Sequence, residues 1–181
     1  MDLGLFTSGY QRYPLEQAFE DASRFGYDYI ELWGGYPHAY VEDLTARGVG
    51  EIDRLIQKYR MPVKCFTPEH NGYPFNYMAG DAFQWERSMV YLEKAIELTA
   101  AMGAPMMLFS AGHAGYKMTG REIEERLQKS LERLTAKAEQ QKVKLILEPL
   151  TIYESNVITS LNDLERALDK VPSPYLVGMC D

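Results

Sequence analysis

The chain has 181 residues, of which 46% are hydrophobic and 12% aromatic, which is enough for one globular domain with a packed core. Its net charge of −7 comes from mixed acidic and basic residues without a basic run, so nucleic acid is not an expected partner. Cys65 and Cys180 have no disulfide or zinc-finger spacing, and no apolar run approaches the roughly 18 residues of a membrane span. We therefore expect a cytoplasmic protein that is neither secreted nor bound to a membrane.

Six short apolar runs alternate with longer segments of helical period, which predicts parallel strands joined by crossover helices. The runs are nearly continuous in apolar residues, so we expect strands that are buried on both faces, with the helices outside. The predicted strands cover residues 2–7, 28–33, 62–67, 105–110, 143–148 and 175–181.

Apolar stripes and capping residues predict a helix after each of the first five runs. The first helix begins at Pro14, the third begins near Asp81 and the fifth follows Ser160. Thr119 and Glu122 have the spacing of a capping box at the start of the fourth helix. The stripes consist of Leu15, Ala18, Phe19 and Ala22; of Ile52, Leu55, Ile56 and Tyr59; of Trp85, Met89, Leu92 and Ile96; of Ile123, Leu127, Leu131, Leu134 and Ala138; and of Leu161, Leu164 and Leu168.

The segment 68–80 is long, aromatic and rich in turn formers, and we interpret it as a loop that acts as a lid over a site. Strand–helix units in series fit either an open doubly wound sheet or a closed barrel. No Gly-rich phosphate loop follows any run, which favours an α/β fold of the (β/α)₈ TIM-barrel type. About five to six of its units are present, and we expect residues 1–181 to form one such domain without its last strands. The runs end in side chains that can reach the barrel mouth, namely Thr7, Trp33, Thr67, Ser110, Glu148 and Asp181.

Two acids at predicted strand ends are candidate metal ligands. Glu148 follows the run Val-Lys-Leu-Ile-Leu and precedes Pro149, so its carboxylate is fixed at the end of a buried strand. It is either a metal ligand or general base, or a structural acid that pairs with a lysine or with backbone N–H groups. Asp181 repeats the arrangement at the end of the sixth run, where fraying of the chain end is the structural alternative. Two acids on neighbouring strand ends can share one divalent cation.

Three other residues are candidates for substrate binding. Glu154 lies in the loop after Glu148 and either bends back to a substrate hydroxyl or is a solvated acid or cap. His113 lies in the small-residue loop Ser-Ala-Gly-His-Ala-Gly-Tyr, which suits close approach of a polyol, although a lone histidine is often structural. Trp33 either stacks on a sugar face or packs the mouth. Glu31 alternates with Trp33, and an inner salt bridge is its structural explanation.

The chain resembles the fructoselysine 3-epimerases, within the xylose-isomerase-like barrel family of sugar epimerases and isomerases. The resemblance is carried by Phe-Thr-Ser-Gly-Tyr-Gln-Arg, Ile-Glu-Leu-Trp-Gly-Gly-Tyr-Pro-His-Ala, Thr-Pro-Glu-His-Asn-Gly-Tyr-Pro-Phe-Asn and Leu-Ile-Leu-Glu-Pro-Leu-Thr-Ile-Tyr-Glu-Ser-Asn-Val. It implies an isomerase that epimerises fructoselysine at C3 by proton abstraction through an enediolate. It also implies a divalent metal ion, often manganese, with Glu148 and Asp181 as ligands, Glu148 as the base and Glu154 as a substrate-holding residue.

Two alternatives remain open. The phosphodiesterases of the same family, related to endonuclease IV, would need more than three histidines and a less acidic surface. The resemblance also implies further ligands and strands, because a complete barrel takes about 250 residues. The other alternative is therefore an inactive fragment that oligomerises through open sheet edges. As partners we expect a sugar or ketosamine and further copies of the chain, with neither nucleic acid nor a membrane.

Overall fold

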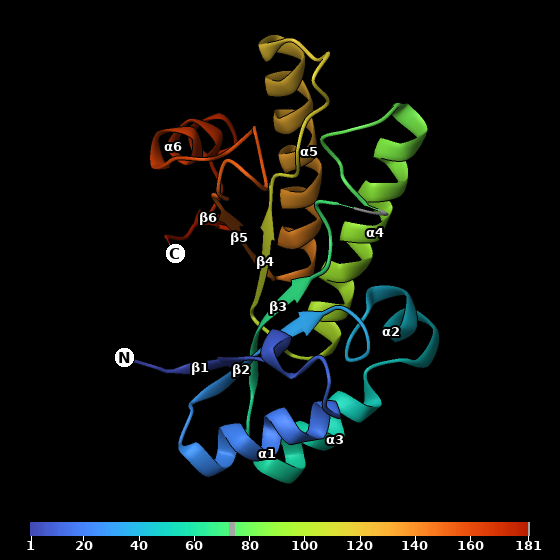
Figure 1. The fold of residues 1–181 in the computed structure, drawn as a ribbon, viewed down its shortest axis with the longest axis vertical. Helices are drawn as coiled ribbons and strands as arrows, with labels where there is room; N and C mark the ends of the chain where they lie inside the picture. Colours follow the sequence, from blue (N-terminus) through green and yellow to red (C-terminus); the bar gives the residue numbers. More distant parts are fainter. Residues whose placement is uncertain (73–74, 181) are drawn as a thin grey trace. The chain divides into compact units, whose positions relative to one another are not determined.

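The computed structural model describes residues 1–72 and 75–180, in which strands and helices alternate (Figure 1). The strands form one sheet in the order β1-β2-β3-β4-β5-β6, and each pair with a described register is parallel. They are β1 Gly4–Phe6, β2 Tyr29–Gly34, β3 Val63–Pro68, β4 Met106–Ser110, β5 Lys144–Glu148 and β6 Leu176–Gly178. The six predicted strands are thus confirmed, each with shifts of a few residues at its ends.

The predicted helices are present, although Leu161 of the last stripe is 53% exposed, and two further helical elements are added. The helices are η1 Thr7–Tyr10, α1 Leu15–Phe25, α2 Val41–Arg47, α3 Gly50–Tyr59, α4 Ala82–Ala101, α5 Gly120–Gln141 and α6 Leu161–Lys170. Helix α1 ends at Gly26, which takes the left-handed conformation with φ of 77°. Thr119 and Glu122 form the predicted capping box of α5, and the Ser160 side chain accepts a hydrogen bond from Asp163 N at the start of α6. The helices η1 and α2 were not predicted.

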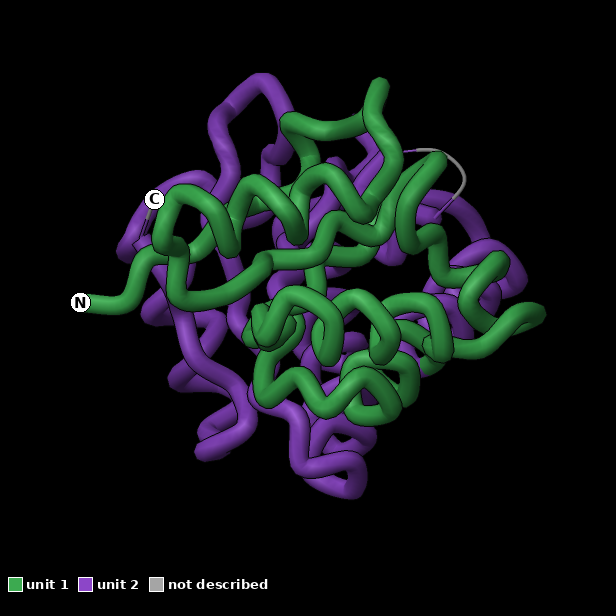
Figure 2. The backbone as a smooth tube through the Cα atoms, turned by 90° about the horizontal axis from the view of Figure 1, so that it is seen from below, with its two compact units in different colours: residues 1–69, 94–107 green, residues 70–93, 108–181 purple. Residues whose placement is uncertain are grey.

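Two compact units make up the chain, coloured separately in Figure 2. Unit 1 comprises residues 1–69 and 94–107, and unit 2 comprises residues 70–93 and 108–181. None of the helices among the described residues is both long and apolar enough to cross a membrane.

Unit 1 holds the first three strands and the helices α1, α2 and α3. In the β2–β3 register, Trp33 stands opposite Thr67 and Gly34 opposite Pro68. Gly34 is required here because a Cβ atom would lie 2.7 Å from the Pro68 Cα atom. Helices α1 and α3 contact each other, and Glu16 of α1 joins them through ion pairs with α3.

Unit 2 holds β5, β6, α5, α6 and the first part of α4. Leu145 pairs with Leu176 and Leu147 pairs with Gly178 between β5 and β6. The Trp85 indole of α4 donates a hydrogen bond of 2.9 Å to the Ser130 hydroxyl of α5. These contacts join β5 to β6 and α4 to α5 within unit 2.

The expected burial of strands on both faces is wrong for β2 and β5. In β2, Ile30 and Leu32 are fully buried, whereas Glu31 and Trp33, which alternate with them, are half-buried. In β5, Leu145 and Leu147 are buried and Glu148 is half-buried. One face of each strand is covered by a helix, α1 or α5. The other face carries side chains that stay partly accessible, namely Glu31 and Trp33 in β2 and Ile146 and Glu148 in β5. The alternation therefore exposes the candidate residues on the less covered face.

Candidate functional site

Trp33 is held at the end of β2 by polar contacts on two sides. Its backbone N–H donates a hydrogen bond of 2.9 Å to the hydroxyl of buried Thr7. Its indole Nε1 donates a hydrogen bond of 2.9 Å to Glu69, the residue after β3. The indole also packs edge-on against His38, with ring centroids 6.3 Å apart. The orientation of the half-buried indole is thus fixed by residues that follow three different strands.

Glu31 lies on the same face of β2 as Trp33, as predicted. The hydroxyl of Thr67, at the end of β3, donates a hydrogen bond of 2.8 Å to the Glu31 carboxylate. Glu31 has a further interaction in the structure. The predicted strand-end residues Thr7, Trp33 and Thr67 therefore belong to one polar group with Glu31 and Glu69 in unit 1.

In unit 2, the end of β4 is tied to the segment that was predicted to act as a lid. Ser110 N–H donates a hydrogen bond of 3.1 Å to His70 Nε2, and the Asn71 side-chain amide donates to the Ser110 hydroxyl. The Tyr77 hydroxyl donates to the Ser110 carbonyl over 3.0 Å. Burial raises the pKa of Tyr77 well above its usual range, so its hydroxyl stays protonated and continues to donate.

Arg126 of α5 holds the other end of the same segment. Its guanidinium donates hydrogen bonds of 2.8–2.9 Å to the carbonyl groups of Tyr77, Ala79 and Gly80. Burial lowers the pKa of Arg126 from its ordinary value, yet three carbonyl dipoles compensate for the charge. Residues 77–80 are thus fastened to α5. Residues 73 and 74 of the predicted lid lie outside the described part of the chain.

His113 follows β4 in a loop that is held from both sides. The Asn76 side chain donates a hydrogen bond of 2.9 Å to the His113 carbonyl. The next peptide N–H, that of Ala114, donates 2.8 Å to Asn156 Oδ1. The half-buried imidazole packs against the exposed ring of Tyr116, with centroids 5.0 Å apart.

Glu154 is exposed and folded back on its own turn. Its carboxylate accepts a hydrogen bond of 2.8 Å from the Thr151 hydroxyl and lies 3.4 Å from Thr151 N. Its own N–H donates to the Thr151 carbonyl over 3.0 Å. The alternative of a loop cap is therefore realised in this state, and a substrate hydroxyl would have to compete with Thr151 for the carboxylate.

Glu148 ends β5 with a half-buried side chain that has an interaction in the structure. Beyond the Leu147–Gly178 pair, Met179 N donates a hydrogen bond of 3.2 Å to the Leu147 carbonyl. The chain after β6 therefore runs beside the end of β5 as far as Met179. Asp181, the second predicted ligand, lies outside the described residues. In the described ranges, no three His, Cys, Asp or Glu side chains group as a metal site.

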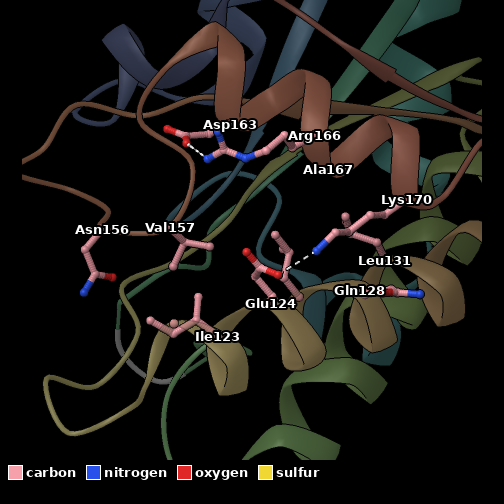
Figure 3. A pocket seen from close by; sticks show the side chains of 12 residues that line it. Ile123, Glu124, Gln128, Leu131, Asn156, Val157, Asp163, Arg166, Ala167 and Lys170 are labelled. Atoms are coloured by element: carbon pink, nitrogen blue, oxygen red, sulfur yellow. Dashed lines mark hydrogen bonds and ion pairs between the residues drawn. The ribbon is translucent and has the colours of Figure 1, made fainter.

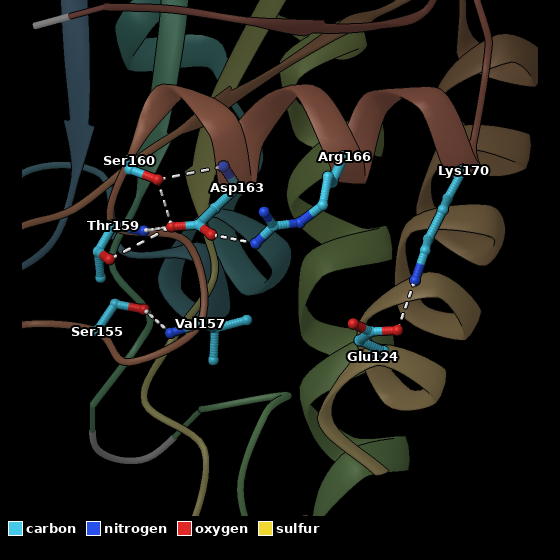
Figure 4. A network of polar contacts seen from close by, with 8 residues as sticks. All are labelled: Glu124, Ser155, Val157, Thr159, Ser160, Asp163, Arg166 and Lys170. Atoms are coloured by element: carbon cyan, nitrogen blue, oxygen red, sulfur yellow. Dashed lines mark hydrogen bonds and ion pairs between the residues drawn. The ribbon is translucent and has the colours of Figure 1, made fainter. Parts of the chain in front are cut away.

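A groove of about 270 Å³ lies between α5 and α6 (Figure 3). Its apolar lining includes Ile123 and Leu127, which were predicted to belong to the buried stripe of α5 but are only half-buried. An ion pair of 2.9 Å between Lys170 and Glu124 crosses it (Figure 4). At the start of α6, Asp163 accepts hydrogen bonds from Ser160 and from Arg166.

Within unit 2, the loops that carry His113 and Glu154 are joined through Asn156, whereas Trp33 belongs to unit 1. Sequence reasoning missed Asn76, Arg126 and Asn156. Their partners lie 37, 46 to 49 and 42 residues away in the chain, so no local pattern identifies them. Arg126 lies on α5, and the loops of Asn76 and Asn156 are distinguished in the sequence only by their polar, turn-forming residues.

A parallel sheet covered by helices, with polar side chains at the carboxyl ends of its strands, is the arrangement of barrel enzymes. The family model described as "Xylose isomerase-like TIM barrel" matches residues 19–181. The chain belongs to this family.

Among curated relatives, a fructoselysine 3-epimerase from Shigella flexneri is 49% identical over all 181 residues of this chain. The chain spans 66% of the length of that relative. The resemblance found in the sequence is thereby confirmed.

Solved structures of the same fold include a D-psicose 3-epimerase in the presence of D-fructose. It has a TM-score of 0.82 at 13% identity, over 99% of this chain and 63% of the other. The IOLI protein with a binding zinc atom has a TM-score of 0.76 at 15% identity, over 97% of this chain and 61% of the other. These similarities confirm the barrel-type fold.

Proposed function

We propose that the protein is a metal-dependent sugar epimerase that acts at C3 of a ketose or ketosamine, with fructoselysine as the specific substrate. The observation that carries the proposal is the half-buried Glu148 carboxylate at the end of β5, in a chain 49% identical to a fructoselysine 3-epimerase. Similarity to D-psicose 3-epimerase in fold agrees with sugar chemistry. We further propose that residues 1–181 belong to one barrel domain of a cytoplasmic homo-oligomer.

The donor chemistry at the end of β5 fits a hard divalent cation. Glu148 supplies a carboxylate, the type of oxygen ligand that manganese and magnesium prefer. We propose Asp181 as the second ligand, because β6 is parallel to β5 and its continuation follows β5 to Met179. The bound zinc in the IOLI protein agrees with a divalent ion, and manganese is our first expectation.

Epimerisation requires that the site remove the proton bound to C3 of the sugar and return a proton to the same carbon. When bound, a divalent ion polarises the ketose carbonyl as a Lewis acid, which acidifies the neighbouring C3–H group. Glu148 takes the C3 proton as the C–H bond breaks, the C–H electron pair forms the second C2–C3 bond, and the carbonyl π pair moves onto O2 to give an enediolate. A proton delivered to the opposite face of C3 by solvent or by a second acid, as the carbonyl at C2 re-forms, completes the epimerisation. We assign substrate binding to Glu154, His113 and Trp33.

The decisive test is Glu148→Gln, which keeps the volume of the side chain and removes its negative charge. We expect bound divalent metal to fall and exchange of the C3 hydrogen of fructoselysine with deuterium from solvent to be lost. Metal content and mass spectrometry of the recovered sugar measure the two effects separately.

Glu139→Gln, on the exposed side of α5, is the matched control and should change neither quantity. Full exchange in the Glu148→Gln variant would refute the role of Glu148. Absence of exchange in the wild-type protein loaded with manganese would refute the epimerase proposal itself.

A further inference from the structure

Two asparagines from different loops form hydrogen bonds with the carbonyl and the N–H group of one peptide unit after β4. The carbonyl of His113 accepts a hydrogen bond from Asn76 Nδ2 at 2.9 Å, and the N–H of Ala114 donates to Asn156 Oδ1 at 2.8 Å. Asn156 Nδ2 then donates 3.2 Å to the Ala114 carbonyl. Asn156 thus satisfies both backbone groups of Ala114, which is fully buried. Buried backbone groups need such partners.

The neighbours of these asparagines strengthen the link between the loops. Buried Ser155 donates a hydrogen bond of 3.3 Å from its hydroxyl to the Gly112 carbonyl and accepts one of 3.0 Å from Val157 N. Gly112 is itself required for the close approach of Asn76, because a Cβ atom would lie 2.3 Å from Asn76 Oδ1. Residues 112–114 are therefore held by residues 155–156 on one side and by Asn76 on the other.

We infer that Asn156 is a positioning residue for substrate binding, which fixes the His113 loop against the Glu154 loop. The inference rests on the proposed function. Asn156 does not act on the substrate itself. By holding the His113–Ala114 peptide, it fixes the backbone from which the imidazole projects. Asn156 lies two residues after Glu154, so its bonds to Ala114 also tie the end of the Glu154 loop to the His113 loop.

This arrangement predicts an effect on affinity rather than on chemistry. His113 and Glu154 are the proposed substrate contacts, whereas the proton at C3 is assigned to Glu148 at the end of β5. Loss of the Asn156 contacts would let the two loops move independently, so that each substrate molecule must order them on binding. The Michaelis constant should rise while turnover at saturation is kept.

The test compares Asn156→Ala and the isosteric Asn156→Asp with Asn162→Ala, a control at an exposed position of α6. Asn156→Asp keeps the acceptor for Ala114 N–H but replaces the donor to the Ala114 carbonyl. Exchange of the C3 hydrogen of fructoselysine with deuterium from solvent gives KM and kcat for each protein. We expect KM to rise about tenfold in both Asn156 variants with kcat within about twofold of wild type, and no change in the control.

A fall in kcat with KM unchanged would overturn the inference, as would unchanged kinetics or loss of folding in both Asn156 variants. If only Asn156→Ala fails to fold, the KM and kcat of Asn156→Asp test the inference. Absence of exchange in the wild-type protein is a different result, because it refutes the proposed function and the positioning role falls with it.

Discussion

The hydroxyl of Thr151 donates a hydrogen bond of 2.8 Å to the carboxylate of Glu154. Glu154 N–H in turn donates to the Thr151 carbonyl, so the two residues close a turn by side-chain and backbone contacts. The carboxylate proposed to bind a substrate hydroxyl is thus already engaged within its own loop. Binding must exchange one hydrogen bond for another.

Replacement of Thr151 by Val should therefore tighten substrate binding. The change keeps the shape of the side chain and removes the competing hydroxyl, which frees the Glu154 carboxylate for the substrate. A hydrogen bond to a carboxylate contributes roughly 1.5–3 kcal/mol when it is shielded from water and less at an exposed residue such as Glu154. The KM for fructoselysine should therefore fall by about two- to tenfold. Steady-state kinetics in both protein backgrounds, with and without Glu154→Ala, measures the effect. A fall in KM that persists in the Glu154→Ala background would contradict the explanation.

Arg126→Lys should loosen residues 77–80. A lysine ammonium cannot present the planar fork that reaches the carbonyl groups of Tyr77, Ala79 and Gly80 together. We expect faster amide hydrogen exchange in this segment and a loss of about 1.5–3 kcal/mol of unfolding free energy. Arg121→Lys, on an exposed side chain paired with Glu125, should change neither. Equal exchange rates in the two variants would argue against the fastening role of Arg126.

Glu16 should make the stability of unit 1 dependent on pH. Hydrogen bonds from Lys58 and then from Arg54 hold the pKa of Glu16 at about 2, below the ordinary value of 4.5. Because the pKa is lowered in the folded state, the stabilisation is complete above pH 4.5 and is lost as the pH falls towards 2. Between pH 6 and 2, the free energy of unfolding measured with urea should fall less for Glu16→Gln than for the wild-type protein. The difference should shrink in high salt because the cluster is partly exposed.

Thr119→Ala should destabilise the start of α5. The Thr119 side chain accepts a hydrogen bond from Glu122 N, and Glu122 reaches back to Thr119 N over 2.7 Å. Removal of an N-cap threonine costs about 1 kcal/mol, which urea denaturation can resolve. Glu122→Gln retains an oxygen that can accept from Thr119 N and should lose less. A larger loss for Glu122→Gln would place the main stabilisation in the charge of Glu122 instead.

Apolar runs and caps were sufficient to predict the six strands and the helices whose buried stripes are long. The capping box at Thr119 was predictable because its two members are three residues apart and need no tertiary partner. Helix α2 was not predicted because it has seven residues, of which only Val41 and Leu44 are buried. In addition, its N-cap makes no side-chain hydrogen bond. Such a short helix is stabilised by its surroundings rather than by its own pattern.

The candidate site was predictable only as a set of strand-end side chains. Glu148, Trp33 and Glu31 were identified because they end or interrupt apolar runs. The partner of the Trp33 indole, Glu69, lies 36 residues away, and no spacing rule connects the two. Likewise, a lone asparagine such as Asn156 has no local signature, since its role depends on a buried backbone in another loop.

The hydrogen bonds from Asn76 and to Asn156 hold the His113–Ala114 peptide in place. They separate the residues of the loops after β4 and β5 that can be varied from those that cannot. Tyr116 and Tyr153 are more than nine-tenths exposed, and their side chains can be randomised in a library that seeks new substrates for the proposed epimerase. Gly112, Asn76 and Asn156 should be kept constant, because they fix the backbone conformation of the His113 loop. Diversity at the two tyrosines would then be sampled on an unchanged backbone.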